Sequence, residues 1–342
     1  MAIAPGVATS TDSNPTEEQG AAIDAPGLNY FVFALFFIFG GITSLNDVIL
    51  PKLKELFTLN YTQAMLIQFC FFTAYLVIGI PGAQLVKRIG YMRGAVVGLL
   101  TMMTGCLLFI PASQTATYGL FLFALFVLAV IAAVVWSFRN RLQGEKHEQS
   151  SLTGGFQLLR RPRFGYGALC IFLYVGAEVS IGSLIVSYLM QNHVMGLGEQ
   201  AAGNMIPLYW GGALVGRIIG SLVLRYTSPG LVLASVAAGA IALLAISTHT
   251  TGTTSGYSLL AIGLMNSIMF PTIFSLACEK LGAKAADGSG IINIAIFGGA
   301  VVPLLTGMLA DATGGNLALA MIIPAVCYAI IAGFGIFARK PA

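Results

Sequence analysis

The sequence places an acid inside an apolar stretch. Asp47 lies in the run from Gly40 to Leu50, with Asn46 beside it. Inserting an ionised acid at the centre of a membrane helix costs roughly 2.5–3.5 kcal/mol, so such acids usually face a cavity and carry function. We therefore predict that Asp47 takes up and releases a proton. The alternative is an ion pair with Lys54 near the outer surface of the membrane.

A second acid, Glu178, stands near the middle of the apolar run from Tyr174 to Ser183. Its depth predicts a binding site for a polar ligand. The alternatives are a structural hydrogen bond to a neighbouring helix, or an ion pair with Arg217, which also lies in an apolar run. For Arg217 itself we expect a structural role, because its long stem can carry the charge to the cytoplasmic interface.

Amide side chains in the apolar runs can both donate and accept hydrogen bonds. They are Gln63, Gln68, Asn266 and Asn293. Amides combined with aromatic rings suit a sugar, and four aromatic residues could stack on a pyranose face: Tyr75, Tyr174, Tyr209 and Trp210. At membrane depth, however, aromatic residues more often face lipid or the interface.

Three glycines recur every four residues within one apolar run: Gly212, Gly216 and Gly220. A stripe of small residues lets two helices approach closely. We interpret this stripe as a packing surface and assign it no chemistry.

Other chemistry is missing from the sequence. The five cysteines occur singly, and the three histidines fall between apolar runs. The sequence has no nucleotide-binding loop, dinucleotide fingerprint, zinc spacing or serine elbow. We therefore expect neither an enzyme nor a metal site.

Ten apolar stretches must position these side chains. Hydrophobic residues make up 57% and charged residues 9% of the 342 residues, and the mean hydropathy is +0.87. A soluble domain has about one quarter charged residues, and each stretch has the roughly 20 residues that cross a bilayer. The net charge of +4 does not indicate a nucleic-acid partner, because the basic residues lie between the apolar runs. The sequence predicts an all-α polytopic membrane protein.

The predicted membrane helices form two groups, four before and six after a basic cytoplasmic linker at residues 139–164. The first group, an incomplete N-terminal bundle over residues 29–138, comprises residues 29–56, 61–86, 92–111 and 117–138. The second group, over residues 165–338, comprises residues 165–190, 200–225, 229–247, 255–279, 287–311 and 316–338. Residues 1–28 and 339–342 are expected to be cytoplasmic tails, the first of them disordered.

The distribution of Lys and Arg orients the predicted helices. With a cytoplasmic N-terminus, only Lys52, Lys54 and Arg217 of the 17 basic residues fall outside the cytoplasmic loops and tails. Short cytoplasmic loops carry an excess of basic residues. Both termini are therefore predicted to be cytoplasmic. Ten helices, an even number, agree with this because they place both termini on the same side.

Several strings in the sequence resemble one known family. The string Gly82-Ala83-Gln84-Leu85-Val86-Lys87-Arg88-Ile89-Gly90-Tyr91 resembles the cytoplasmic loop signature of the major facilitator superfamily, with Lys87 where that signature has an acid. More specific strings resemble its fucose and glucose/galactose proton-symporter branch: Leu45-Asn46-Asp47, Tyr61-Thr62-Gln63-Ala64-Met65, Tyr174-Val175-Gly176-Ala177-Glu178-Val179, Tyr209-Trp210-Gly211-Gly212 and Asn266-Ser267-Ile268-Met269-Phe270-Pro271-Thr272. The last of these is most similar to bacterial glucose/galactose transporters.

This resemblance implies a hexose:proton symporter of the bacterial inner membrane, which needs a proton gradient and no cofactor. Glucose or galactose is the implied sugar, with fucose as an alternative. Asp47 is then the proton-coupling residue. The expected substrate contacts are Asn46, Gln68, Glu178, Asn266 and Asn293, and the expected structural or gating residues are Arg88, Gly90, Gly212, Gly216, Arg217 and Gly220. The expected partners are the sugar, the proton and the lipid bilayer.

The sequence departs from this family between Leu120 and Arg139. Family members have twelve helices, whereas residues 121–130 resemble the start of the fourth and residues 131–138 the end of the sixth, so that about two helices are absent. A natural loss and a deletion in the gene model would give the same sequence. Three interpretations stay open: a working symporter, a transport-inactive remnant or sugar sensor, and a facilitator for another small polar solute. Oligomerisation could cover the gap.

Overall fold

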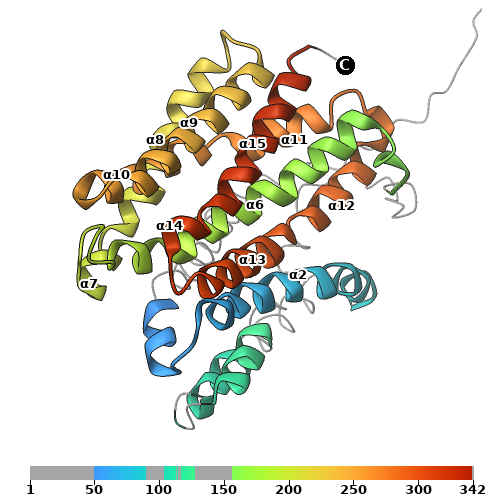
Figure 1. The fold of residues 1–342 in the computed structure, drawn as a ribbon. Coiled ribbons are helices and arrows are strands. Elements are labelled where there is room, and N and C mark those ends of the chain that lie inside the picture. Colours follow the sequence, from blue (N-terminus) through green and yellow to red (C-terminus); the bar gives the residue numbers. More distant parts are fainter. Residues whose placement is uncertain (1–49, 90–103, 113, 115–116, 128–155, 341–342) are drawn as a thin grey trace, which may run out of the picture. The chain divides into compact units, whose positions relative to one another are not determined.

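A computed structural model describes residues 50–89, 104–112, 114, 117–127 and 156–340 (Figure 1). Within these residues every regular element is a helix. The candidate residues Asn46, Asp47 and Gly90 lie outside the described residues, and so does residue range 128–155, which holds most of the predicted linker. The backbone of Arg88 is described but its side chain is not.

The C-terminal part of the described chain forms six spans that are long and apolar enough to cross a membrane. Two are single helices, α6 (Pro162–Leu189) and α9 (Pro229–His249). Four are helices in two pieces: α7 (Glu199–Gly203) with α8 (Ile206–Val223), α10 (Gly252–Asn266) with α11 (Met269–Ala277), α12 (Ala285–Ala295) with α13 (Gly298–Ala312), and α14 (Leu317–Ala320) with α15 (Ile322–Phe337). A short 3-10 helix (Gly282–Lys284) precedes α12.

These spans match the six predicted after the linker to within a few residues, but the breaks inside them were not predicted. Three breaks precede a proline in the first turn of the next helix: Pro207 in α8, Pro271 in α11 and Pro324 in α15. Proline lacks the N–H that would bond to the carbonyl four residues earlier, so the hydrogen-bond ladder is interrupted there.

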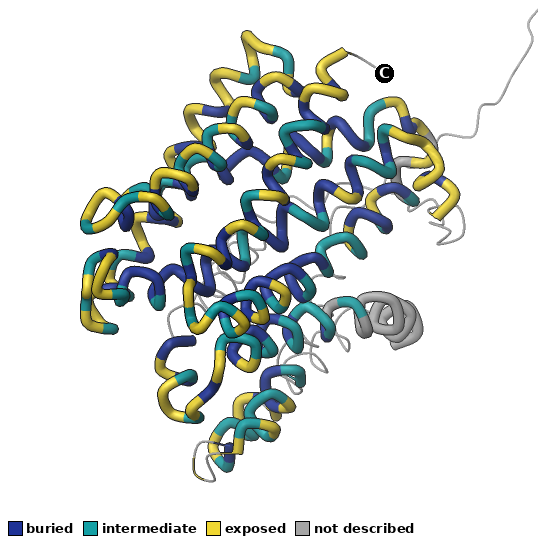
Figure 2. The backbone as a smooth tube through the Cα atoms, viewed as in Figure 1, coloured by how far each residue is buried: buried dark blue, intermediate teal, exposed yellow. Residues whose placement is uncertain are grey.

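Helix α6 is the most buried of the six spans. It contacts α11, α12, α13 and α15 (Figures 1 and 2). Of its most apolar 18-residue window 72% is buried, against 28% for the span Glu199–Val223. A helix surrounded by other helices is apolar on all sides, so a polar residue on α6 has to find its partner inside the protein.

Glycines allow α6 and α13 to cross at close range. A Cβ atom at Gly298 would overlap the carbonyl of Phe172, and one at Gly176 would overlap the side chain of Val302. The same helix α13 packs on its other side against α2 (Tyr61–Ile89). Helix α13 therefore lies between the N-terminal helix α2 and the central helix α6.

The predicted glycine stripe lies where α8 meets α10 and the turn that follows it. A Cβ at Gly216 would overlap the Leu264 carbonyl oxygen, and one at Gly220 would overlap the Ile268 side chain. Gly212 has more room, with the Leu264 amide nitrogen 3.4 Å from a Cβ built there. At the other two positions only a missing side chain permits this packing.

The described N-terminal part also contains short helical stretches at residues 50–56, 104–112 and 118–127. Aromatic rings connect them: Phe57 packs on Tyr118 and Phe121, with ring centroids 5.7 and 5.9 Å apart, and Phe109 packs on Phe121 at 5.2 Å. The Tyr118 hydroxyl donates to the backbone carbonyl of Gln63 at the start of α2.

Candidate functional site

Asn266, the last residue of α10, is the centre of a buried hydrogen-bond cluster. Its side chain is 1% exposed. The Nδ2 group donates to the Tyr209 hydroxyl of α8 at 2.9 Å, and Oδ1 accepts from the Tyr328 hydroxyl of α15 at 2.8 Å. Because α10 ends here, the backbone carbonyl of Asn266 is open to a side-chain donor, and the Tyr174 hydroxyl of α6 lies 3.0 Å from it. The cluster joins four spans through one residue.

Glu178 extends this cluster along α6. It lies one turn after Tyr174, and its Oε1 atom is 2.8 Å from the Tyr174 hydroxyl. The Tyr174 hydroxyl has one proton and two oxygen neighbours, Glu178 and the Asn266 carbonyl, so it donates to one of them at a time. When Glu178 is protonated, it can donate to Tyr174 while Tyr174 donates to Asn266. The arrangement therefore depends on whether Glu178 carries a proton.

Arg217 of α8 interacts electrostatically with Glu178 without forming an ion pair at contact distance. Among the described residues, the ion pairs within 4.0 Å are Lys52 with Glu55 and Arg163 with Glu279. Arg217 is exposed at the surface of α8, beside apolar residues that are exposed too. The direct Glu178–Arg217 pair considered from the sequence is absent from this structure.

Gln68 of α2 lies at the contact between the N-terminal and C-terminal halves. It is 5% exposed, and its Nε2 group donates to the Ser183 hydroxyl of α6 at 2.9 Å. Gln68 therefore contacts α6, the helix that carries Glu178, from the N-terminal half of the chain.

The remaining predicted polar residues lie elsewhere. Asn293 is exposed on α12. Gln63 belongs to a helix cap at the start of α2: its Oε1 accepts from the Asn60 amide at 3.0 Å, and the Asn60 side chain accepts from the Gln63 amide at 2.7 Å. That reciprocal pair is a capping box, so Gln63 has a structural role.

Of the four aromatic residues considered from the sequence, two are buried in the cluster and two are not placed there. Tyr174 and Tyr209 are buried, 4% and 1% exposed, and act through their hydroxyl groups. Trp210 is 38% exposed on α8, and the side chain of Tyr75 lies outside the described part. Tyr328 was missed, although a buried tyrosine hydroxyl in an apolar run needs a partner.

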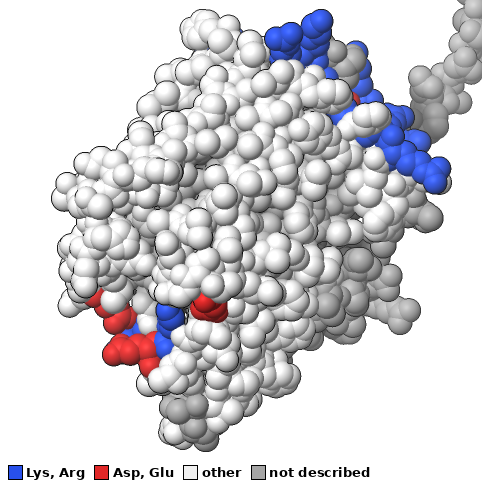
Figure 3. Space-filling view, in the orientation of Figure 1, with Lys and Arg blue, Asp and Glu red and all other residues white. Residues whose placement is uncertain are grey.

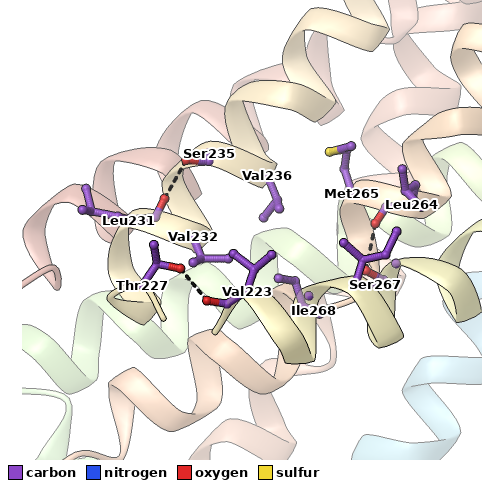
Figure 4. A pocket seen from close by; sticks show the side chains of 13 residues that line it. Val223, Thr227, Leu231, Val232, Ser235, Val236, Leu264, Met265, Ser267 and Ile268 are labelled. Atoms are coloured by element: carbon purple, nitrogen blue, oxygen red, sulfur yellow. Dashed lines mark hydrogen bonds between the residues drawn. The ribbon is translucent and has the colours of Figure 1, made fainter. Parts of the chain in front are cut away.

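A cavity of about 260 Å³ lies between α8, α9 and the end of α10 (Figure 4). Its polar side chains bond to carbonyls of their own segments: Thr227 to Val223 at 2.6 Å, Ser235 to Leu231 at 2.9 Å and Ser267 to Leu264 at 2.8 Å. With its hydroxyl protons already used, the lining offers little to a hydrated sugar. The cluster around Asn266 and Glu178 is the better candidate site.

Charged side chains gather at the two ends of the spans. Lys and Arg collect near the C-terminal end of α15, whereas the opposite end, near α7 and α14, carries acids together with a few basic side chains (Figure 3). At the basic end the Arg163 guanidinium donates to the carboxylate of Glu279, to the Leu276 carbonyl at 3.1 Å and to the Lys340 carbonyl at 2.8 Å. These bonds fix the start of α6 to the ends of α11 and α15.

Six apolar spans, four of them joined by a buried hydrogen-bond cluster, define a multi-pass α-helical membrane protein. The chain belongs to the Major Facilitator Superfamily, whose family model matches residues 119–303. Members of this superfamily are transporters and not enzymes, which agrees with the expectation from the sequence. The predicted family and the predicted all-α membrane fold are thus confirmed.

Individual relatives point to one branch of the superfamily. The chain is 42% identical, over 383 aligned positions, to the glucose/galactose transporter of Brucella abortus, covering 90% of this chain and 92% of the relative. It is 33% identical to the putative glucose/galactose transporter of Helicobacter pylori, covering 90% and 95%. The crystal structure of the Escherichia coli fucose:proton symporter matches with a TM-score of 0.64 at 25% identity, covering 90% of this chain and 97% of that one.

Proposed function

We propose that this protein is a hexose:proton symporter that takes up glucose or galactose. The observation that carries the proposal is the 42% identity to the Brucella abortus glucose/galactose transporter over almost the full length of both chains. The similarity to a fucose:proton symporter supports coupling to protons. No observation favours a facilitator for another solute or a transport-inactive remnant.

Glu178 is the first residue that we propose to contact the sugar. It is the one acid of the buried cluster, its carboxylate can accept hydrogen bonds from sugar hydroxyls, and Tyr174 already orients it. Asn266 is 1% exposed and bonded to two tyrosines, so a sugar reaches it only after this buried cluster opens. We therefore propose that Asn266 positions Tyr174, Tyr209 and Tyr328 around the site.

The other candidates keep the roles proposed from the sequence. Asp47 carries the coupled proton, and Asn46 contacts the sugar. Gln68 reaches the substrate from the N-terminal half, close to its bond with Ser183. Asn293, exposed on α12, stays a proposed sugar contact.

We propose that the protein lies in the bacterial inner membrane with both termini in the cytoplasm. The segregation of charge supports this orientation, since the end of the spans with Arg163, Arg339 and Lys340 is the basic one (Figure 3). The loops at the other end, after α6 and after α9, carry no Lys or Arg.

We further propose that the N-terminal bundle has four helices instead of six. The alignment to the Brucella abortus relative extends over 383 positions, more than the 342 residues of this chain. Ninety per cent of this chain enters that alignment, about 308 residues (0.90 × 342), so about 75 positions of the relative (383 minus 308) have no counterpart here. Unmatched positions in this number are enough for about two membrane helices with their connecting loops.

The test is uptake of labelled glucose, galactose and fucose into proteoliposomes with an imposed inward proton gradient. The proposal expects gradient-dependent uptake of glucose or galactose that Asp47→Asn abolishes. Solute flux that is independent of the proton gradient and is not inhibited by any hexose would support the facilitator interpretation instead.

A further inference from the structure

The carboxylate of Asp311, near the end of α13, caps the first turn of α2. One oxygen accepts from the Tyr61 amide at 2.8 Å, and the other accepts from the Thr62 amide at 2.7 Å and from the Thr62 hydroxyl at 2.6 Å. The bonded residues are about 250 positions apart in the chain and belong to its N-terminal and C-terminal halves.

Helix α2 depends on these bonds to complete its N-terminus. The first amides of a helix have no partner inside it and need a cap. The Asn60 side chain takes the amide of Gln63, and the Ala64 amide bonds to the Asn60 carbonyl at 3.0 Å. The amides of Tyr61 and Thr62 are left, and Asp311 takes both. The cap of α2 is thus completed by the other half of the protein.

A second contact reinforces the same place. The Lys54 ammonium lies 3.1 Å from the centre of the Tyr61 ring, and it interacts electrostatically with Asp311. An ammonium over an aromatic face is attracted to the ring. Lys54 therefore holds Tyr61 in position beside the carboxylate.

The seam just below the cap is apolar and closely fitted. A Cβ at Gly307 of α13 would lie 2.8 Å from the Tyr61 carbonyl oxygen and 2.9 Å from the Met65 side chain, and Met65 is 0% exposed. Opening this seam at its Tyr61 end thus requires that the three bonds to Asp311 break first.

We propose that Asp311 is a latch that holds the outer ends of α2 and α13 together, and that it must release each time the substrate site opens to the outside. This inference rests on the proposed function, because a symporter exposes its site alternately to the two sides of the membrane. It also uses the proposed orientation, which places the Tyr61 end of α2 outside. Asp311 is a positioning residue and need not touch the sugar.

The reporter is a single cysteine, Met65→Cys, in a chain whose five native cysteines are replaced. Its thiol is buried while the latch is closed, and a membrane-impermeant maleimide reaches it from outside when the seam opens. Labelling is timed in spheroplasts with no sugar present, so the readout does not depend on transport.

Asp311→Asn, which keeps the shape but loses the charge, is expected to speed labelling by about threefold, and Asp311→Ala by about tenfold. Thr62→Val removes the hydroxyl donor alone and is expected to give a smaller increase. The matched control is Glu55→Gln, which also removes one negative charge but from an exposed pair with Lys52, and it should leave the rate unchanged. All variants are first shown to elute as monodisperse protein.

Equal labelling rates in the parent, Asp311→Asn and Asp311→Ala would overturn the latch. If the Asp311 variants fail to fold, the labelling rate of Thr62→Val is the test. An unchanged rate in that variant would also overturn the latch. Labelling in inverted vesicles but not in spheroplasts would overturn its outward placement. Faster labelling in a protein that transports no sugar would retain the latch and reject the proposed function.

Discussion

The Tyr174 hydroxyl lies 2.8 Å from Glu178 and 3.0 Å from the backbone carbonyl of Asn266. One hydroxyl proton cannot serve both oxygens at once. Glu178, the acid proposed to contact the sugar, is therefore connected to the end of α10, and through Asn266 to α8 and α15. A change at Glu178 can be transmitted to three other spans by hydrogen bonds alone.

Glu178→Gln is expected to weaken sugar binding by about tenfold while the protein still folds. The glutamine amide can donate to Tyr174 as a protonated acid would, but the charged acceptor for sugar hydroxyls is lost, and hydrogen bonds to charged groups are worth about 1.5–3 kcal/mol. The measurement is equilibrium binding of labelled galactose and glucose. Unchanged affinity for both sugars would remove Glu178 from the site.

Asn266→Ala is expected to lower the free energy of unfolding by about 1–3 kcal/mol, because it leaves the buried hydroxyls of Tyr209 and Tyr328 without their partner. A thermal melt in detergent measures the change. The matched control is Asn293→Ala, which removes an exposed amide from α12 and should melt with the parent. If the two variants melted together, Asn266 would not be the centre of the cluster.

Gly216→Ala is expected to destabilise the protein by about 1–3 kcal/mol, since the added methyl group overlaps the Leu264 carbonyl oxygen and Ser267. Gly211, five residues earlier on α8, has open space where a Cβ would lie. Gly211→Ala should therefore be neutral, or slightly stabilising through its helix propensity. Equal melting temperatures for the two alanine variants would contradict the packing assigned to this face.

The C-terminal spans could be predicted from the sequence because length and hydropathy alone define a membrane helix. The breaks within them were less evident, although Pro207, Pro271 and Pro324 mark three of them. The packing role of Gly216 follows from its spacing, but only the structure identifies Leu264 as its neighbour.

The site could be predicted only in part. Glu178 stands out as an acid in an apolar run, whereas the role of Asn266 depends on three tyrosines from other helices, and sequence spacing does not reveal how those helices pack. The role of Asp311 could not be predicted from the sequence, because an acid at the end of a membrane helix looks the same in sequence as an acid in a loop. Asn46 and Asp47 lie outside the described residues and stay predictions.

The most direct test of the central claim measures protons and sugar together. Proteoliposomes containing the protein and a trapped pH-sensitive dye receive galactose or glucose without an imposed gradient. A symporter brings a proton in with each sugar, so the lumen should acidify on sugar addition, and Asp47→Asn should abolish the change. Entry of labelled sugar with no change in internal pH would contradict proton-coupled transport.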